Sequence, residues 1–178
     1  MMVRLDPYSP TPAARASRVV TMALPFVIGV FCVLLSFVPV GRIFGMTGMP
    51  AFALMAIYYW AVVRPDMFPV YAVFAVGLLT DLLSGGPIGL WAFTYVLVYI
   101  VVLTQRFLMA NAPFSVFWFG FFVVGMITGV VSWAIASIAF GMFLPVSPVL
   151  TYILVTVAVF PLFSFLFGRI ERRILPSA

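Results

Sequence analysis

FSVFWFGFFVVGMITGVVSWAIASIAF, residues 114–140, is an apolar run that contains no charged side chain. A surface helix of a soluble protein keeps a polar face, and this run has none. An α-helix of about 20 apolar residues is long enough to cross the hydrocarbon core of a bilayer. The run therefore predicts a transmembrane helix and decides the fold class of the chain.

Similar apolar runs lie on both sides of it. They predict further helices at 19–38, 67–83, 88–108 and 149–168. A sixth segment, 51–63, is too short to span a core of about 30 Å. Extending it back to Ile43 supplies the length but includes two glycines and Pro50, so we expect a broken or interfacial start. Pro25 and Pro161 lie inside predicted helices and are expected to kink them.

The composition agrees with one membrane domain. Hydrophobic residues make up 66% of the 178 residues and charged residues 7%, whereas about one quarter of a soluble domain is charged. We therefore predict an all-α, polytopic six-helix bundle over 19–168, with cytoplasmic tails at 1–18 and 169–178. Histidine is absent and Cys32 is the only cysteine, which excludes an intramolecular disulfide and makes a cofactor or metal site unexpected.

The positive charges indicate the orientation. All nine basic residues are arginines, and they sit at the ends of apolar runs instead of forming a nucleic-acid-binding patch. If the N-terminus is cytoplasmic, alternating spans place every arginine except Arg42 on the cytoplasmic side, as the positive-inside rule favours. We expect both termini in the cytoplasm and contacts with anionic lipid. The expected topology anchors are Arg18, Arg64, Arg106, Arg169, Arg172 and Arg173.

Asp81 is the one acid inside a predicted apolar helix. Gly77, Asp81 and Ser84 share a helix face, which forms a small and polar stripe. An ionisable group in a membrane span is a candidate functional residue, because its transfer into hydrocarbon is costly. The alternative is that Asp81 caps the following turn or pairs with an arginine such as Arg42. The sequence does not choose between the two.

Three other patterns are candidates for binding or packing. Ser84-Gly85-Gly86-Pro87 permits a close backbone approach to a ligand, but a simple hairpin between two spans is favoured. Trp91, Tyr95 and Tyr99 form a helical stripe that would line a cavity or, more simply, pack in the bundle and the outer aromatic belt. A stripe of small residues predicts a close helix contact with a partner inside or outside the chain, and its members are Gly125, Gly129, Ser132 and Ala136.

The stretch Gly77–Ala92, GLLTDLLSGGPIGLWA, carries a family resemblance together with Tyr59-Trp60, Arg64-Pro65 and Gln105-Arg106-Phe107-Leu108. It resembles the rod shape-determining protein MreD family. The resemblance implies a non-enzymatic protein of the bacterial inner membrane that supports peptidoglycan synthesis and rod shape. It also implies binding to MreC, association with MreB, RodA and a penicillin-binding transpeptidase, and a fold like the substrate-binding subunits of energy-coupling-factor transporters.

Two other function classes stay open at this point. A transport subunit for a small solute or lipid would use Asp81, Tyr95 and Tyr99 to line an outward-facing pocket between the helices at 67–83 and 88–108. An intramembrane enzyme acting on lipid is the weakest hypothesis, because the sequence offers no nucleophile–base pair.

Overall fold

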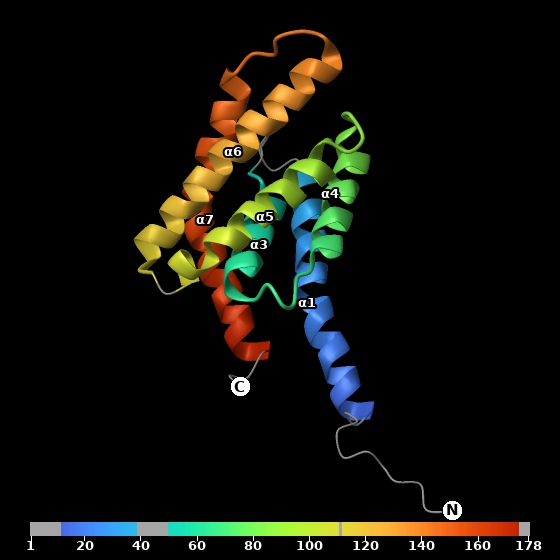
Figure 1. The fold of residues 1–178 in the computed structure, drawn as a ribbon, viewed down its shortest axis with the longest axis vertical. Coiled ribbons are helices and arrows are strands. Elements are labelled where there is room, and N and C mark those ends of the chain that lie inside the picture. Colours follow the sequence, from blue (N-terminus) through green and yellow to red (C-terminus); the bar gives the residue numbers. More distant parts are fainter. Residues whose placement is uncertain (1–11, 39–49, 111, 175–178) are drawn as a thin grey trace, which may run out of the picture.

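Six α-helices form the described part of the computed structural model, which covers residues 12–38, 50–110 and 112–174. They are α1 Pro12–Phe37, α3 Phe52–Val63, α4 Val70–Ser84, α5 Leu90–Ala110, α6 Phe114–Phe140 and α7 Ser147–Ile174 (Figure 1). Three of them are long and apolar enough to cross a membrane, at Leu90–Met109, Phe114–Phe140 and Ser147–Arg173. The all-α prediction is confirmed for these residues.

Most predicted boundaries hold to within a few residues, and local chemistry explains the differences. The helix predicted at 114–140 is observed unchanged as α6. The helix predicted from Met67 begins only at Val70, because Pro69 precedes it with extended backbone. The helix predicted from Ile88 begins at Leu90, because Gly89 has a φ of 96°, outside the helical region.

Two helices extend beyond their predicted ends. α1 begins at Pro12, since the missing N–H of a proline costs nothing in the first turn. α7 continues to Ile174, so its three terminal arginines belong to the helix and do not follow it as a separate tail. Both helices continue through their internal prolines, Pro25 and Pro161.

The shortest helix, α3, lies at the centre of the bundle. Every residue from Ala53 to Val62 is buried, and α1, α5 and α7 all contact the helix. Figure 1 shows α3 behind α5, between α1 and α7. Its 12 residues rise only about 18 Å. A helix that is apolar on all sides suits such a position, because protein surrounds it in place of lipid.

Aromatic rings connect this central helix to its neighbours. The centroid of the Tyr58 ring lies 5.1–5.6 Å from the ring centroids of Phe117, Phe121 and Phe160. The Tyr58 hydroxyl donates a 2.8 Å hydrogen bond to the Phe117 carbonyl. Phe121 on α6 stacks on Phe160 of α7 with the ring centroids 3.9 Å apart. The cluster therefore joins α3, α6 and α7.

Consecutive helices run in opposite directions, which gathers the arginines at one end. The Pro12 end of α1, the Ile174 end of α7 and the turn between α3 and α4 lie at the same end of the molecule in Figure 1. Arg64 follows α3 in that turn, and the arginines of α7 lie in its last turns. Arg42, Arg4 and the side chains of Arg15 and Arg18 lie outside the described residues.

Candidate functional site

Asp81 on α4 accepts three hydrogen bonds from the main chain at the start of α5. Its Oδ2 atom is 3.0 Å from the Gly89 nitrogen and 3.1 Å from the Ala92 nitrogen, and its Oδ1 atom is 2.8 Å from the Trp91 nitrogen. The first N–H groups of a helix have no partner within the helix, and a carboxylate satisfies them and complements the helix dipole. Asp81 therefore caps α5 from the preceding helix.

This geometry favours the capping alternative over a free acid in the membrane. Asp81 is only 2% exposed, and both of its carboxylate oxygens have backbone donors. Arg42, the arginine named for the alternative pairing, lies outside the described residues. Ser84, at the end of α4, donates a 3.2 Å hydrogen bond to the Asp81 carbonyl and extends the same local network.

The hairpin around Asp81 requires glycine at specific positions. A Cβ atom at Gly77 would lie 2.5 Å from the Ala92 Cα and 2.9 Å from the Ala92 nitrogen, so α4 and α5 touch backbone to backbone there. Gly85 ends α4 in the left-handed region with a φ of 66°. The hairpin interpretation of the Ser84–Pro87 turn is thus the one that the structure favours.

The two tyrosines of the α5 stripe have different environments. Tyr95 is buried and lines a cavity of about 180 Å³ next to Thr80 and Trp91. Tyr99 donates hydrogen bonds to the carbonyls of Phe68, at 2.5 Å, and Pro65, at 3.4 Å, just before α4 begins. Asp81 therefore lies near the end of α4, whereas Tyr99 contacts the segment before its start. The structure does not bring Asp81, Tyr95 and Tyr99 together in one pocket.

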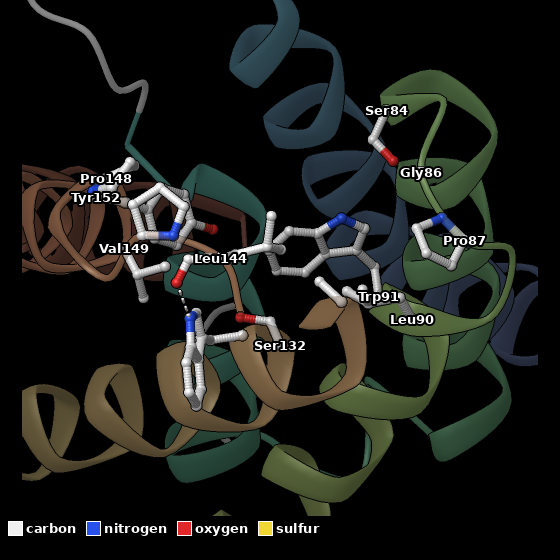
Figure 2. A pocket seen from close by; sticks show the side chains of 13 residues that line it. Ser84, Gly86, Pro87, Leu90, Trp91, Ser132, Leu144, Pro148, Val149 and Tyr152 are labelled. Atoms are coloured by element: carbon white, nitrogen blue, oxygen red, sulfur yellow. Dashed lines mark hydrogen bonds between the residues drawn. The ribbon is translucent and has the colours of Figure 1, made fainter. Parts of the chain in front are cut away.

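A second candidate site is an apolar groove of about 430 Å³, here called the hairpin groove, between the α4–α5 turn, the end of α6 and the start of α7 (Figure 2). The Trp91 indole lies between Pro87 on one side and the Val149–Tyr152 side of α7 on the other. Thirteen residues line the groove: Ser84, Gly86, Pro87, Leu90, Trp91, Ser132, Trp133, Ala136, Leu144, Pro145, Pro148, Val149 and Tyr152.

The hairpin groove combines residues that the sequence assigned to separate features. Ser84, Gly86, Pro87 and Trp91 were candidates for partner or ligand contact, whereas Ser132 and Ala136 were expected in helix packing. Sequence reasoning missed the contribution of the segment between α6 and α7, whose only signal was its pair of prolines. The Trp133 indole holds that segment in place by donating a 2.9 Å hydrogen bond to the Leu144 carbonyl, drawn as a dashed line in Figure 2.

The two glycines of the small-residue stripe pack within the chain. A Cβ atom at Gly125 would lie 3.7 Å from side-chain atoms of Ile153 and Val157 on α7. Gly129, one turn further along α6, faces Ile153 and Val149. Their close partner is therefore α7, while Ser132 and Ala136 continue the stripe into the groove.

A polar cluster joins α3 and α7 at the arginine-rich end. Glu171 pairs with Arg64, with 3.4 Å between Nε and Oε1, and accepts a 2.9 Å hydrogen bond from the Tyr59 hydroxyl. Among the described residues, Arg64 and Glu171 form the one ion pair. Arg106 lies over the Phe107 ring at 4.6 Å from its centroid.

The described residues contain no group of three side chains of the types that commonly hold a metal ion. In the comparison with protein families, the model described as rod shape-determining protein MreD matches residues 15–169. That range contains the hairpin, the groove and the α6–α7 contact. No curated protein and no solved structure matches the chain.

Proposed function

The chain belongs to the MreD family of rod shape-determining proteins, and on this premise we propose that it is a non-enzymatic membrane scaffold that binds MreC. Membership of this family supports a role of the chain in rod shape determination. Binding of MreC, support of peptidoglycan synthesis, and association with MreB, RodA and a penicillin-binding transpeptidase through the complex are the proposed details. The fold resemblance to energy-coupling-factor subunits remains a prediction.

The observation that carries the proposal is the hairpin groove. Its lining includes Gly86, Ser132 and Ala136, and small residues let a second helix approach closely in a membrane. Trp91 and Trp133 supply broad apolar surfaces beside them. We propose that an apolar helix of MreC occupies this groove, next to the turn that carries the most specific part of the family motif.

The proposed location is the bacterial cytoplasmic membrane, with all six helices embedded and both termini in the cytoplasm. The grouping of Arg64 and the α7 arginines at one end supports this orientation, because positive side chains favour the cytoplasmic face. The groove would then open near the outer leaflet, where the periplasmic part of MreC begins.

Co-purification from the native membrane tests the proposal. The tagged chain should recover MreC, and Ala136→Trp, which fills the groove, should abolish that recovery. Ile138→Trp is the matched control, because Ile138 lies on the same helix and is 81% exposed. If the unmodified chain recovers no MreC, the scaffold proposal is wrong. If Ala136→Trp recovers MreC as well as Ile138→Trp does, MreC binds elsewhere.

An alternative is a transport subunit for a small solute or lipid. The observation that favours it is the cavity of about 180 Å³ that shares Ser84, Trp91 and Tyr152 with the groove. Recovery of an ATP-binding-cassette pair with its membrane coupling subunit, or a bound solute in native mass spectrometry, would support this alternative over the scaffold.

A further inference from the structure

The last turns of α7 have two chemically distinct faces. Ser164, Phe167 and Glu171 recur at helical spacing and face the bundle, and the first two are buried. Leu162, Phe165, Arg169 and Arg172 recur on the opposite side and are exposed. Along this outer face an apolar strip passes directly into a basic one.

The single acid of this region is turned away from the basic face. The Glu171 carboxylate is held inward by the Tyr59 hydroxyl and the Arg64 guanidinium, both from the α3 side of the bundle. Among the described residues, no carboxylate pairs with Arg169, Arg172 or Arg173. The outer face of α7 therefore keeps the positive charge of three arginines.

These arginines converge on one hollow of about 350 Å³. Arg169, Arg172 and Arg173 line it together with Phe165. The Arg169 guanidinium lies over the Phe165 ring, 5.1 Å from its centroid, which orients it toward the apolar strip. Arg172 donates through Nε to the Gly168 carbonyl at 3.2 Å, and its terminal N–H groups make no further hydrogen bond within the described residues.

We propose that this surface, Leu162 and Phe165 with Arg169, Arg172 and Arg173, is a binding site for an anionic phospholipid. Leu162 is 69% and Phe165 60% exposed, so a fatty acyl chain has an apolar surface to lie on. The next two turns present guanidinium groups, which bind phosphate oxygens in a planar, bidentate geometry. A phospholipid has the same order of groups: an apolar chain followed by a phosphate.

Charge selects among phospholipids at this site. Three clustered arginines favour a net-negative head group, since a zwitterionic head group brings an ammonium ion that they repel. Each basic residue near an anionic membrane surface contributes a factor of about fivefold in binding. The site is separate from the hairpin groove, so it does not depend on the proposed scaffold function.

Lipid binding to the purified full chain tests the site. Native mass spectrometry would be used to titrate phosphatidylglycerol and phosphatidylcholine with identical acyl chains. We expect preferential binding of phosphatidylglycerol, and a loss of about fivefold in its affinity in each of Arg169→Gln, Arg172→Gln and Arg173→Gln. Arg106→Gln removes the same charge from α5 and should change the affinity less than twofold. Arg172→Lys keeps the charge and should retain most of the preference.

Several results would overturn the site. Equal affinity for the two lipids would show that the arginines do not select charge. A preference unchanged by the three α7 variants would place anionic lipid elsewhere. Competition by inorganic phosphate alone at the same concentration as phosphatidylglycerol would exclude a role for the apolar strip. Loss of a co-purifying cytoplasmic protein in the α7 variants, with lipid affinity intact, would make this face a protein contact.

Discussion

The indole N–H of Trp118 on α6 donates a 3.0 Å hydrogen bond to the main-chain carbonyl of Val157 on α7. In an uninterrupted helix this carbonyl would accept from the residue four positions later, which is Pro161 and has no N–H. A carbonyl without a donor is costly in a membrane. Trp118 therefore supplies from α6 the hydrogen bond that the proline removes from α7.

Trp118→Phe should reduce the free energy of unfolding by about 1 kcal/mol, because the Val157 carbonyl loses its donor. In a Pro161→Ala background the helix regains its own N–H donor, so the same change should cost much less. A double-mutant cycle measured by denaturant unfolding in mixed micelles would test this coupling. An equal cost in both backgrounds would show that the indole acts by packing alone.

Asp81→Asn should insert normally but lower the free energy of unfolding by about 1–3 kcal/mol. An amide has one acceptor oxygen and directs N–H groups at the Gly89, Trp91 and Ala92 donors, so the α5 cap is only partly replaced. Ser84→Ala, which removes one side-chain hydrogen bond nearby, is the control and should cost less. Thermal unfolding in detergent checks the order.

The effect of Asp81→Asn on cell shape separates structure from function. Rod-shaped cells with a normal amount of the variant would mean that Asp81 is a cap and nothing more. Loss of rod shape at normal abundance and stability would instead indicate that the carboxylate also contacts a partner.

Gly77→Ala should be among the most damaging single substitutions in the chain. The added methyl group would meet the backbone of Ala92, which cannot rotate away as a side chain would. Gly125→Ala is the matched control, because its methyl group would lie at an ordinary contact distance of 3.7 Å from Ile153 and Val157. We expect little folded Gly77→Ala protein by size-exclusion chromatography and normal recovery of Gly125→Ala. Equal recovery would contradict the close α4–α5 approach.

Glu171→Gln should weaken the contact between α3 and α7. It removes the negative charge that pairs with Arg64 and that accepts a hydrogen bond from the Tyr59 hydroxyl. We expect a loss of about 1 kcal/mol in the free energy of unfolding. Tyr59→Phe removes one of the two partners and should cost about half as much. If Glu171→Gln is neutral while Tyr59→Phe is not, the hydroxyl packs without depending on the carboxylate.

The sequence by itself determined which segments are helices. Apolar run lengths, prolines and glycines placed α6 without error and located the hairpin at Ser84–Pro87. These features are local, because a positive φ and a proline ring each act on the backbone of the residue itself. They ended helices at the turns, whereas α1 and α7 continue through Pro25 and Pro161. The small-residue stripe was also local information, because residues three or four apart lie on one face of a helix.

Only the tertiary structure decided which apolar surface faces protein and which faces outward. In a membrane protein, the surfaces that contact other helices and the surfaces that contact lipid are both apolar, so hydropathy does not distinguish them. For that reason nothing in the sequence placed α3 at the centre, chose α7 as the partner of Gly125 and Gly129, or joined Trp91 to Ala136 in one groove. The same limit applies to Asp81. The sequence showed that Asp81 lies near the turn, but the three backbone N–H groups that it accepts from depend on how closely α4 and α5 approach at Gly77.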